Sequence, residues 1–388
     1  MAEVKPELVL QRSDALSKWG TQMPIPATVE GRMRYVMALD VFWQGASPAV
    51  PVAGYSDGSV AVFDSSSRSE RSVMQDAHGK EPVHVVQMLK GTSGGILSNG
   101  RDGTVKLWDL RQRAPAAVIG PGITKGVKHT IDCASMAPST SGLLAISMGP
   151  ELAMIDTRAL GNGFVHGAFP GLHTDDILRL RFHPLRPEML LSCAADGLAC
   201  FIDTSKASSV DDMLDGVVNV GSDIVEAVFD GPNSSYVCCT TSTHTVDIWN
   251  IEECTLLGRF PSPRDAVPAA ASTSFVVGCH LDDGGTKACV WLGDNQGTIV
   301  RTAFGPSTGR LEPEKLYSCG HSAGVRCFCI TDDRRWVFTG GEDGRICMWD
   351  MRAQGWQQRK DDRRAGGGRA RGLKKRASKS ASASSAPY

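Results

Sequence analysis

Short stretches in which apolar and polar residues alternate recur along the chain at nearly equal spacing. The clearest are residues 96–109 and 337–350. Each has an apolar pair, small residues, an Asp-Gly step, an alternating stretch and a Trp-Asp ending. Alternation with a period of two is typical of a half-buried β-strand. The pattern therefore predicts β-hairpins.

The Asp-Gly steps at Asp102-Gly103 and Asp343-Gly344 predict how the strands of each hairpin are joined. Such a pair supplies the positive φ angles of a two-residue type I′ turn. Further β-rich runs precede four of the units, and an outer strand would bring each unit to four strands. The runs are 83–89, 177–182, 224–229 and 325–330.

The hairpin pattern repeats seven times. Weaker copies end at Phe63-Asp64, Ile155-Asp156, Ile202-Asp203, Trp249-Asn250 and Thr302-Ala303. The seven ends lie at positions 64, 109, 156, 203, 250, 303 and 350, so the steps are 45, 47, 47, 47, 53 and 47 residues. We assign the longer step to extra residues around Asp282-Asp283-Gly284-Gly285. Four-stranded repeats of this length are typical of β-propeller blades.

These endings resemble the WD-repeat family over about residues 7–352, which implies an all-β, seven-bladed β-propeller. In that family a buried His, Ser or Thr, Asp and Trp tetrad holds each blade together. The resemblance implies a role for two complete sets and one partial set, in which Ile202 replaces the Trp. They are His78, Ser98, Asp102 and Trp108; His321, Thr339, Asp343 and Trp349; and His173, Ser192 and Asp196. Residues 173–184, 195–203 and 340–344 carry a narrower resemblance within the family.

The last unit contains three predicted strands, so another segment must complete it. The β-compatible stretch Pro6–Gln11 precedes the first unit. We expect this segment to form the outer strand of the last blade, because closing the ring protects edges that would otherwise pair with other chains.

The charges of the chain divide it into two parts. The net charge of −1 combines 30 basic and 40 acidic residues in 1–351 with eleven basic and two acidic residues in 352–388. We expect a propeller domain over 1–352 and a disordered basic tail over 353–388, since few apolar residues and high charge cannot form a core. Lys374, Lys375 and Arg376 fit a nuclear-import signal or a contact with nucleic-acid phosphates. With only Trp356 and Tyr388 available for stacking, sequence-specific reading of bases is not expected.

No catalytic, cofactor or metal motif emerges from the sequence. The twelve cysteines lie between Cys133 and Cys347 without a C-x-x-C pair, so we expect buried thiols and neither zinc nor disulfides. His173 with Asp175 and Asp176 is interpreted as a tetrad histidine followed by a solvated loop. Nothing resembles a secretory signal, and no apolar run reaches about 18 residues, so we expect no membrane segment.

Two Arg residues suggest an alternative role. Arg111 and Arg352 follow Trp-Asp-x, as in the substrate receptors of cullin-4 ubiquitin ligases, which implies contact with the ligase adaptor. In ordinary propellers such an Arg satisfies a nearby acidic group, and this interpretation is preferred. The other candidate contacts are loop residues: Lys125, Lys128, Asp175, Asp176, Arg264, Asp265 and Arg326.

The sequence thus favours a non-enzymatic scaffold without cofactors that binds other proteins. The tail suggests a nuclear or nucleolar complex, with ribosome assembly as the first process to test and RNA or pre-ribosomal particles as a further partner. A cytoplasmic location stays open. The alternative is a substrate receptor of a cullin-4 ubiquitin ligase.

Overall fold

The computed structural model describes most of the repeat region. The described residues are 20–22, 34–42, 49–67, 69–89, 95–112, 114–124, 127–138, 142–162, 164–206, 209–267, 275–282, 284–285, 287–305, 307–318 and 320–351. These all belong to a compact unit spanning Met1–Ala353, which is separate from a second unit, Gln354–Tyr388. The predicted basic tail lies outside the described residues.

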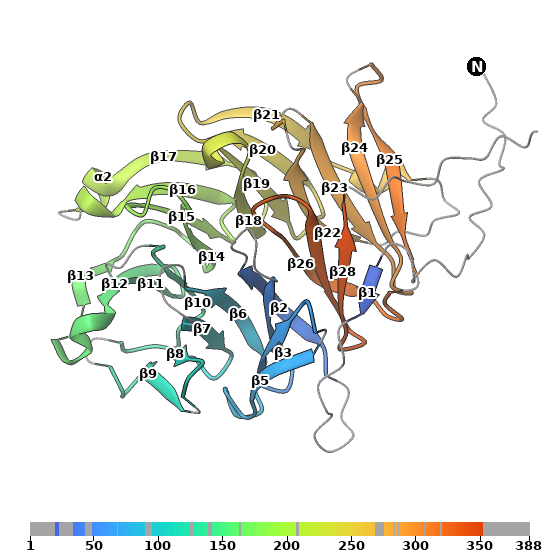
Figure 1. Ribbon diagram of the computed structural model, residues 1–388. Helices are drawn as coiled ribbons and strands as arrows, with labels where there is room; N and C mark the ends of the chain where they lie inside the picture. The colour runs from blue at the N-terminus through green and yellow to red at the C-terminus, as the bar shows by residue number, and fades with distance from the viewer. Residues whose placement is uncertain are drawn as a thin grey trace, which may run out of the picture. The chain divides into compact units, whose positions relative to one another are not determined.

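Seven four-stranded antiparallel sheets follow one another around a ring, so the predicted seven-bladed all-β propeller is confirmed (Figure 1). Blade one consists of β2 (Val36–Phe42), β3 (Val50–Tyr55), β4 (Val60–Asp64) and β5 (Ser69–Met74). Blade two consists of β6 (Val83–Met88), β7 (Gly95–Gly100), β8 (Val105–Asp109) and β9 (Pro115–Ile119). Blade three consists of β10 (Cys133–Met136), β11 (Leu143–Met148), β12 (Glu151–Asp156) and β13 (Phe164–Phe169). Blades four and five contain β14 (Ile177–Phe182), β15 (Met189–Ala194), β16 (Leu198–Asp203), β17 (Leu214–Asn219); and β18 (Ile224–Asp230), β19 (Tyr236–Thr241), β20 (Val246–Asn250), β21 (Thr255–Phe260). Blades six and seven contain β22 (Phe275–Leu281), β23 (Ala288–Gly293), β24 (Ile299–Gly305), β25 (Arg310–Tyr317); and β26 (Val325–Ile330), β27 (Trp336–Gly341), β28 (Ile346–Asp350) with β1 (Gly20–Gln22).

The ring closes through the N-terminal part of the chain, but not through the predicted residues. Strand β1 pairs antiparallel with β28, with Thr21 opposite Met348. The outer strand of blade seven is therefore Gly20–Gln22 and not Pro6–Gln11, which lies outside the described residues. The hydrophobic pattern did not distinguish the two segments, because pairing with β28 requires only backbone groups in register.

The turns between the second and third strands also differ from the prediction. Gly103 has φ +74°, but Asp102 is not among the residues with positive φ. Gly103 N donates to Gly100 O at 3.0 Å and Gly100 N to Thr104 O at 3.3 Å. This is a longer turn with one left-handed residue, not a two-residue type I′ turn. The Asp102 carboxylate stabilises it by accepting the Thr104 N–H at 3.1 Å.

The extra residues of the long sixth repeat lie elsewhere than predicted. Residues 282–287, between β22 and β23, match the length of 89–94 and 137–142 in blades two and three. Residues 261–274, between β21 and β22, form the longer connection. Repeat spacing alone cannot place an insertion within a unit, so the Asp-Gly content of 282–285 was misleading. One short helix, η4 (Pro263–Ala266), lies in this longer connection. The others lie elsewhere: η1 (Thr157–Asn162), η2 (Thr204–Lys206), α2 (Val210–Met213) and η3 (Pro232–Ser234).

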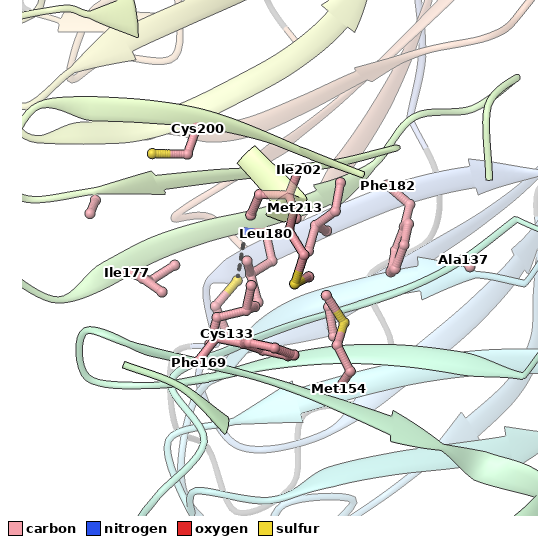
Figure 2. Packing of buried hydrophobic residues seen from close by; sticks show 14 residues of the cluster. Cys133, Ala137, Met154, Phe169, Ile177, Leu180, Phe182, Cys200, Ile202 and Met213 are labelled. Atoms are coloured by element: carbon pink, nitrogen blue, oxygen red, sulfur yellow. Dashed lines mark hydrogen bonds between the residues drawn. The ribbon is translucent and has the colours of Figure 1, made fainter. Parts of the chain in front are cut away.

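Apolar side chains fill the spaces between neighbouring blades. Figure 2 shows the cluster between blades three and four, where Met154 and Phe169 face Leu180, Ile202 and Met213. Cys133 belongs to this cluster, and its Sγ accepts the Leu180 N–H at 3.2 Å. Eight of the eleven described cysteines are buried and all eleven are free thiols, which fits small apolar residues of the core.

Polar side chains on the first strand of a blade tie it to the next blade. Asp40 Oδ2 accepts Met88 N at 2.7 Å, and Asp230 Oδ2 accepts Leu281 N at 2.7 Å. Similar bonds run from Met136 N to Gln87 Oε1 at 2.9 Å and from Phe182 N to Ser135 Oγ at 3.2 Å. These bonds hold the innermost strands in fixed relation to one another.

Candidate functional site

Each blade presents the turn between its second and third strands on one face of the ring. The loop that leads into its first strand lies on the same face, because neighbouring strands are antiparallel. We call this the turn face. The tetrad positions and most of the predicted loop contacts lie here.

In blade two, four side chains form a continuous chain of hydrogen bonds. His78 Nδ1 lies 2.9 Å from Asp102 Oδ1, and His78 Nε2 lies 2.7 Å from Ser98 Oγ. Trp108 Nε1 donates to the same Ser98 Oγ at 2.8 Å. Burial lowers the pKa of His78, so the neutral imidazole donates to Asp102 and accepts from Ser98. Burial alone would raise the pKa of Asp102, but the hydrogen bond with His78 helps to lower it below the usual range.

Blade seven repeats the arrangement, and blade four repeats part of it. His321 lies 3.1 Å from Asp343 and 2.8 Å from Thr339, which also accepts from Trp349 Nε1 at 2.8 Å. In blade four the corresponding chain is His173, Ser192 and Asp196, with His173 Nε2 2.7 Å from Ser192 Oγ. The chain of hydrogen bonds stops there because the Ile202 side chain has no N–H to donate. The side chains of all three histidines are inaccessible to solvent, which suits structural roles.

Blade five keeps the Trp but loses its acceptor. Trp249 pairs with Val237 as Trp108 pairs with Ile96, which places Cys239 where blade two has Ser98. The Trp249 Nε1 atom is buried without a hydrogen-bond partner. In blade six Trp291, on the second strand, donates instead to His280 Nδ1 at 2.8 Å.

Blade one uses a pair of side chains that the sequence did not reveal. Arg34 is 5% exposed, its Nε lies 3.0 Å from Asp57 Oδ2, and it also bonds to Ser59 Oγ. Its Cζ lies 4.2 Å from the centroid of the Tyr55 ring. Tyr55 pairs with Val36 as Gly100 pairs with Val83, and a Cβ at Gly100 would lie only 2.5 Å from the His78 ring. Tyr55 and Arg34 therefore take the place of the tetrad histidine.

Two arginines and one glutamate on neighbouring innermost strands form a second group that sequence analysis missed. Arg179 Nε lies 3.2 Å from one Glu226 oxygen, and an Arg181 N–H donates to the other at 3.0 Å. The Ala227 N–H donates to Glu226 at 3.1 Å. Burial would raise the pKa of Glu226, but the two guanidinium groups lower it. Nothing in the local sequence signals this pairing, because the partners belong to different repeats.

The predicted loop contacts are spread over the molecule and do not converge on one site. Asp175 and Asp176 are exposed in the loop before β14, and Lys128 is exposed before β10. Arg326 on β26 pairs with Glu342. Arg264 and Asp265 lie in η4, while Lys125 lies outside the described residues.

Arg111 makes a local ion pair. Its Nε and terminal nitrogen lie 2.9 and 2.6 Å from the two Asp109 oxygens, while 75% of its side chain is exposed. Arg158 and Asp156 repeat the same fork at 2.9 Å in blade three, where Ile155 replaces Trp. The fork therefore forms in both described Asp-x-Arg endings, with or without a preceding Trp. Arg352 and the tail residues Lys374, Lys375 and Arg376 lie outside the described residues.

Seven closed blades with these tetrads define a WD-repeat β-propeller. The family described as "WD domain, G-beta repeat" matches residues 313–350, which include blade seven. The chain is a WD-repeat protein.

Its relatives agree with this assignment. It is similar to the WD repeat-containing protein 89 homolog of Dictyostelium discoideum, with 24% identity over 319 residues, 81% of this chain and 82% of the relative. The narrower resemblance carried by residues 173–184, 195–203 and 340–344 is to WD repeat-containing protein 89, in line with this relative. WD repeat-containing protein GTS1 of Arabidopsis thaliana is 28% identical over 261 residues, which cover 64% of each chain. A weaker match is nucleoporin Nup43 of Homo sapiens, with 23% identity over 161 residues, 41% of this chain and 40% of the relative.

Proposed function

We propose that this protein is a non-enzymatic scaffold that joins other proteins within a nuclear or nucleolar complex. The observation that carries the proposal is the closed ring, whose innermost strands are tied together while charged loops remain exposed on the turn face. A rigid support with variable loops suits recognition of partners. Ribosome assembly is the process to test first.

The arrangement of reactive side chains favours binding over catalysis. The tetrad histidines are buried against their own Ser, Thr and Asp partners, so none is free to take a proton from a substrate. Among the described residues no group of three or more His, Cys, Asp or Glu side chains is placed to hold a metal ion. No described helix is both long and apolar enough to cross a bilayer. The burial of the tetrad histidines supports a role in binding.

The nuclear setting rests on the basic cluster Lys374-Lys375-Arg376. Closely spaced cations suit import signals and contacts with phosphates. The similarity to a protein named as a nucleoporin adds modest support.

Affinity purification with mass spectrometry tests this function. The full chain should recover nuclear or pre-ribosomal proteins, with part of the association lost in high salt. A triple variant, Lys374→Ala, Lys375→Ala and Arg376→Ala, should shift the protein toward the cytoplasm in fluorescence microscopy. A nuclear fraction equal to that of the wild type would refute the role of the cluster, and recovery of cytoplasmic assemblies alone would refute the nuclear complex.

A second candidate is a substrate receptor for a cullin-4 ubiquitin ligase. The observation in its favour is the exposure of Arg111, which leaves most of its side chain accessible despite the ion pair with Asp109. The double variant Arg111→Ala and Arg352→Ala should abolish co-purification of the ligase adaptor if the candidate is right. Arg158→Ala is a matched control, because Arg158 makes the same fork without a preceding Trp. Equal recovery of the adaptor by both variants, or its absence from the wild type, would reject this function.

A further inference from the structure

The connection between the third and fourth strands of blade four contains an exposed serine that is followed by two aspartates. Ser209 directly precedes α2, which lies beside β17, the outermost strand of the blade (Figure 1). The side chains of Ser209, Asp211 and Asp212 are all exposed. Ser209 is the only Ser or Thr of the chain with an acidic residue at both the second and the third following position.

The backbone around Ser209 can enter the groove of another protein. Ser209 has φ −151° and ψ 166°, an extended conformation, and extended segments are the form in which many peptides lie along a binding groove. Its Oγ donates to Asp212 Oδ2 at 2.8 Å and accepts the Asp212 N–H at 3.2 Å. Only the four residues Val210–Met213 are helical, and so short a helix has little stability of its own. Met213 is buried between blades three and four, so opening of the segment is confined to the residues before it.

The charges around Ser209 are mainly negative. Residues 203–215 include four aspartates and a single cation, Lys206. Lys206 Nζ lies 3.2 Å from Asp203 and 2.7 Å from Asp215, so it is held by the two carboxylates at the ends of this segment. Negative charge therefore dominates directly after Ser209. An enzyme whose substrate groove is basic would be attracted to this segment.

We propose that Ser209 is phosphorylated by a protein kinase of the class that selects acidic residues after the serine. Ser209 Oγ attacks the γ-phosphorus of ATP, the bond from that phosphorus to the bridging oxygen breaks, and ADP leaves. The hydroxyl proton passes to the catalytic carboxylate of the kinase. The product gains a charge of about −1.5 to −2 near pH 7 beside Asp211 and Asp212. The modification goes beyond the proposed scaffold function and does not depend on it.

Ser67 offers a contrast within the same chain. It is exposed, and Glu70 stands at the third following position. Two cations, Arg68 and Arg71, flank this glutamate in the sequence. A kinase that requires only an exposed serine would modify Ser67 and Ser209 alike, whereas a kinase that selects acidic residues should prefer Ser209.

Incubation of the unphosphorylated full-length chain with casein kinase II and ATP, followed by mass spectrometry that localises the phosphate, tests the inference. We expect one phosphate at Ser209 and none there in Ser209→Ala. The double variant Asp211→Asn and Asp212→Asn should slow the initial rate about tenfold, because two charges beside the acceptor are lost. Ser67→Ala is the matched control and should react at the rate of the wild type.

The location of the phosphate and its dependence on the aspartates decide the inference. A phosphate at Ser209 whose rate of addition falls in the aspartate variant supports it. An unmodified Ser209, a phosphate at Ser208 or in the tail alone, or equal modification of Ser67 and Ser209 overturns it. An unchanged rate in the aspartate variant does the same. Localisation on the wild type requires no substitution, and Ser209→Thr keeps an acceptor hydroxyl, so a folding defect of Ser209→Ala cannot imitate the expected result.

Discussion

The guanidinium group of Arg34 lies over the ring of Tyr55, with Cζ 4.2 Å from the ring centroid, and its Nε lies 3.0 Å from Asp57. Together these two residues fill the space that a histidine occupies in blades two, four and seven. The arrangement links the loop before the first strand to the turn between the second and third strands, as the histidine does elsewhere. Blade one is thus held by a cation on an aromatic ring instead of a neutral imidazole.

Removal of this cation should destabilise the propeller. Arg34→Ala leaves Asp57 and Ser59 without their buried partner, and we expect a loss of about 3 kcal/mol in the free energy of unfolding. Urea denaturation followed by tryptophan fluorescence measures the change. Arg71→Ala, at an exposed position of the same blade, is the control and should lie close to wild type. Equal midpoints for the two variants would show that the Arg34 contacts contribute little.

The hydroxyl of Tyr55 should matter far less than its ring. This oxygen is buried without a hydrogen-bond partner. Tyr55→Phe removes an unsatisfied polar group while keeping the surface on which Arg34 lies, so we expect unchanged or slightly higher stability. A clear fall in the denaturation midpoint would contradict this account of the pair.

The contribution of a tetrad serine to the free energy of unfolding should depend on its number of hydrogen-bond partners. Ser98→Ala leaves both His78 Nε2 and Trp108 Nε1 unpaired, whereas Ser192→Ala leaves only His173 Nε2. We expect losses of about 2–3 kcal/mol for the first and about 1–2 kcal/mol for the second, because each buried orphan group has its own cost. Denaturation of the two variants in parallel provides the comparison. Equal losses of stability, or a larger loss in Ser192→Ala, would argue against this chain of hydrogen bonds.

Gly278 should be intolerant of a side chain. A Cβ at this position would lie 1.7 Å from Phe328 Cε1 in the next blade. Gly278→Ala should therefore lower stability by roughly 1–3 kcal/mol through overpacking. Adding Phe328→Leu should restore part of the loss by making room. A double variant that is no more stable than the sum of the single effects predicts would rule out this contact as the cause.

Acidification should weaken the fold in two stages. Burial lowers the pKa of His78 and His173, so the unfolded chain binds protons at these sites first as the pH falls. Their contribution is complete above about pH 7 and is lost as the pH falls from the unfolded value of about 6.5 through the lower pKa of the folded state. The pKa of Asp102 and Asp196 is also lowered, so their contribution is lost only below about pH 4. The urea midpoint should be lower at pH 5.5 than at pH 7.5. The difference between the two midpoints should be smaller in His173→Gln than in the wild type.

Much of the fold follows from short-range patterns in the sequence. The Trp-Asp endings and the Asp-Gly turns indicate the third strand of a blade and the hairpin to which it belongs. The spacing of the repeats predicts seven blades. The resemblance to the WD-repeat family predicted the Ser98 and Trp108 positions, and both residues lie within one hairpin. The Arg34–Tyr55 pair could not be predicted, since it follows no tetrad pattern and Tyr55 stands where blades two, four and seven have Gly or Ala.

The sequence by itself determined the seven repeats and the all-β class, because these depend on alternation and turn chemistry within about 47 residues. The residues of two complete tetrads followed from the resemblance of the sequence to the WD-repeat family. Only the tertiary structure decided which N-terminal segment closes blade seven, and which side chains meet between blades. Arg179 and Glu226 lie one repeat apart in sequence, and they meet because closure of the ring places β14 beside β18. Contacts of this kind depend on how repeats pack against each other, which no single repeat encodes.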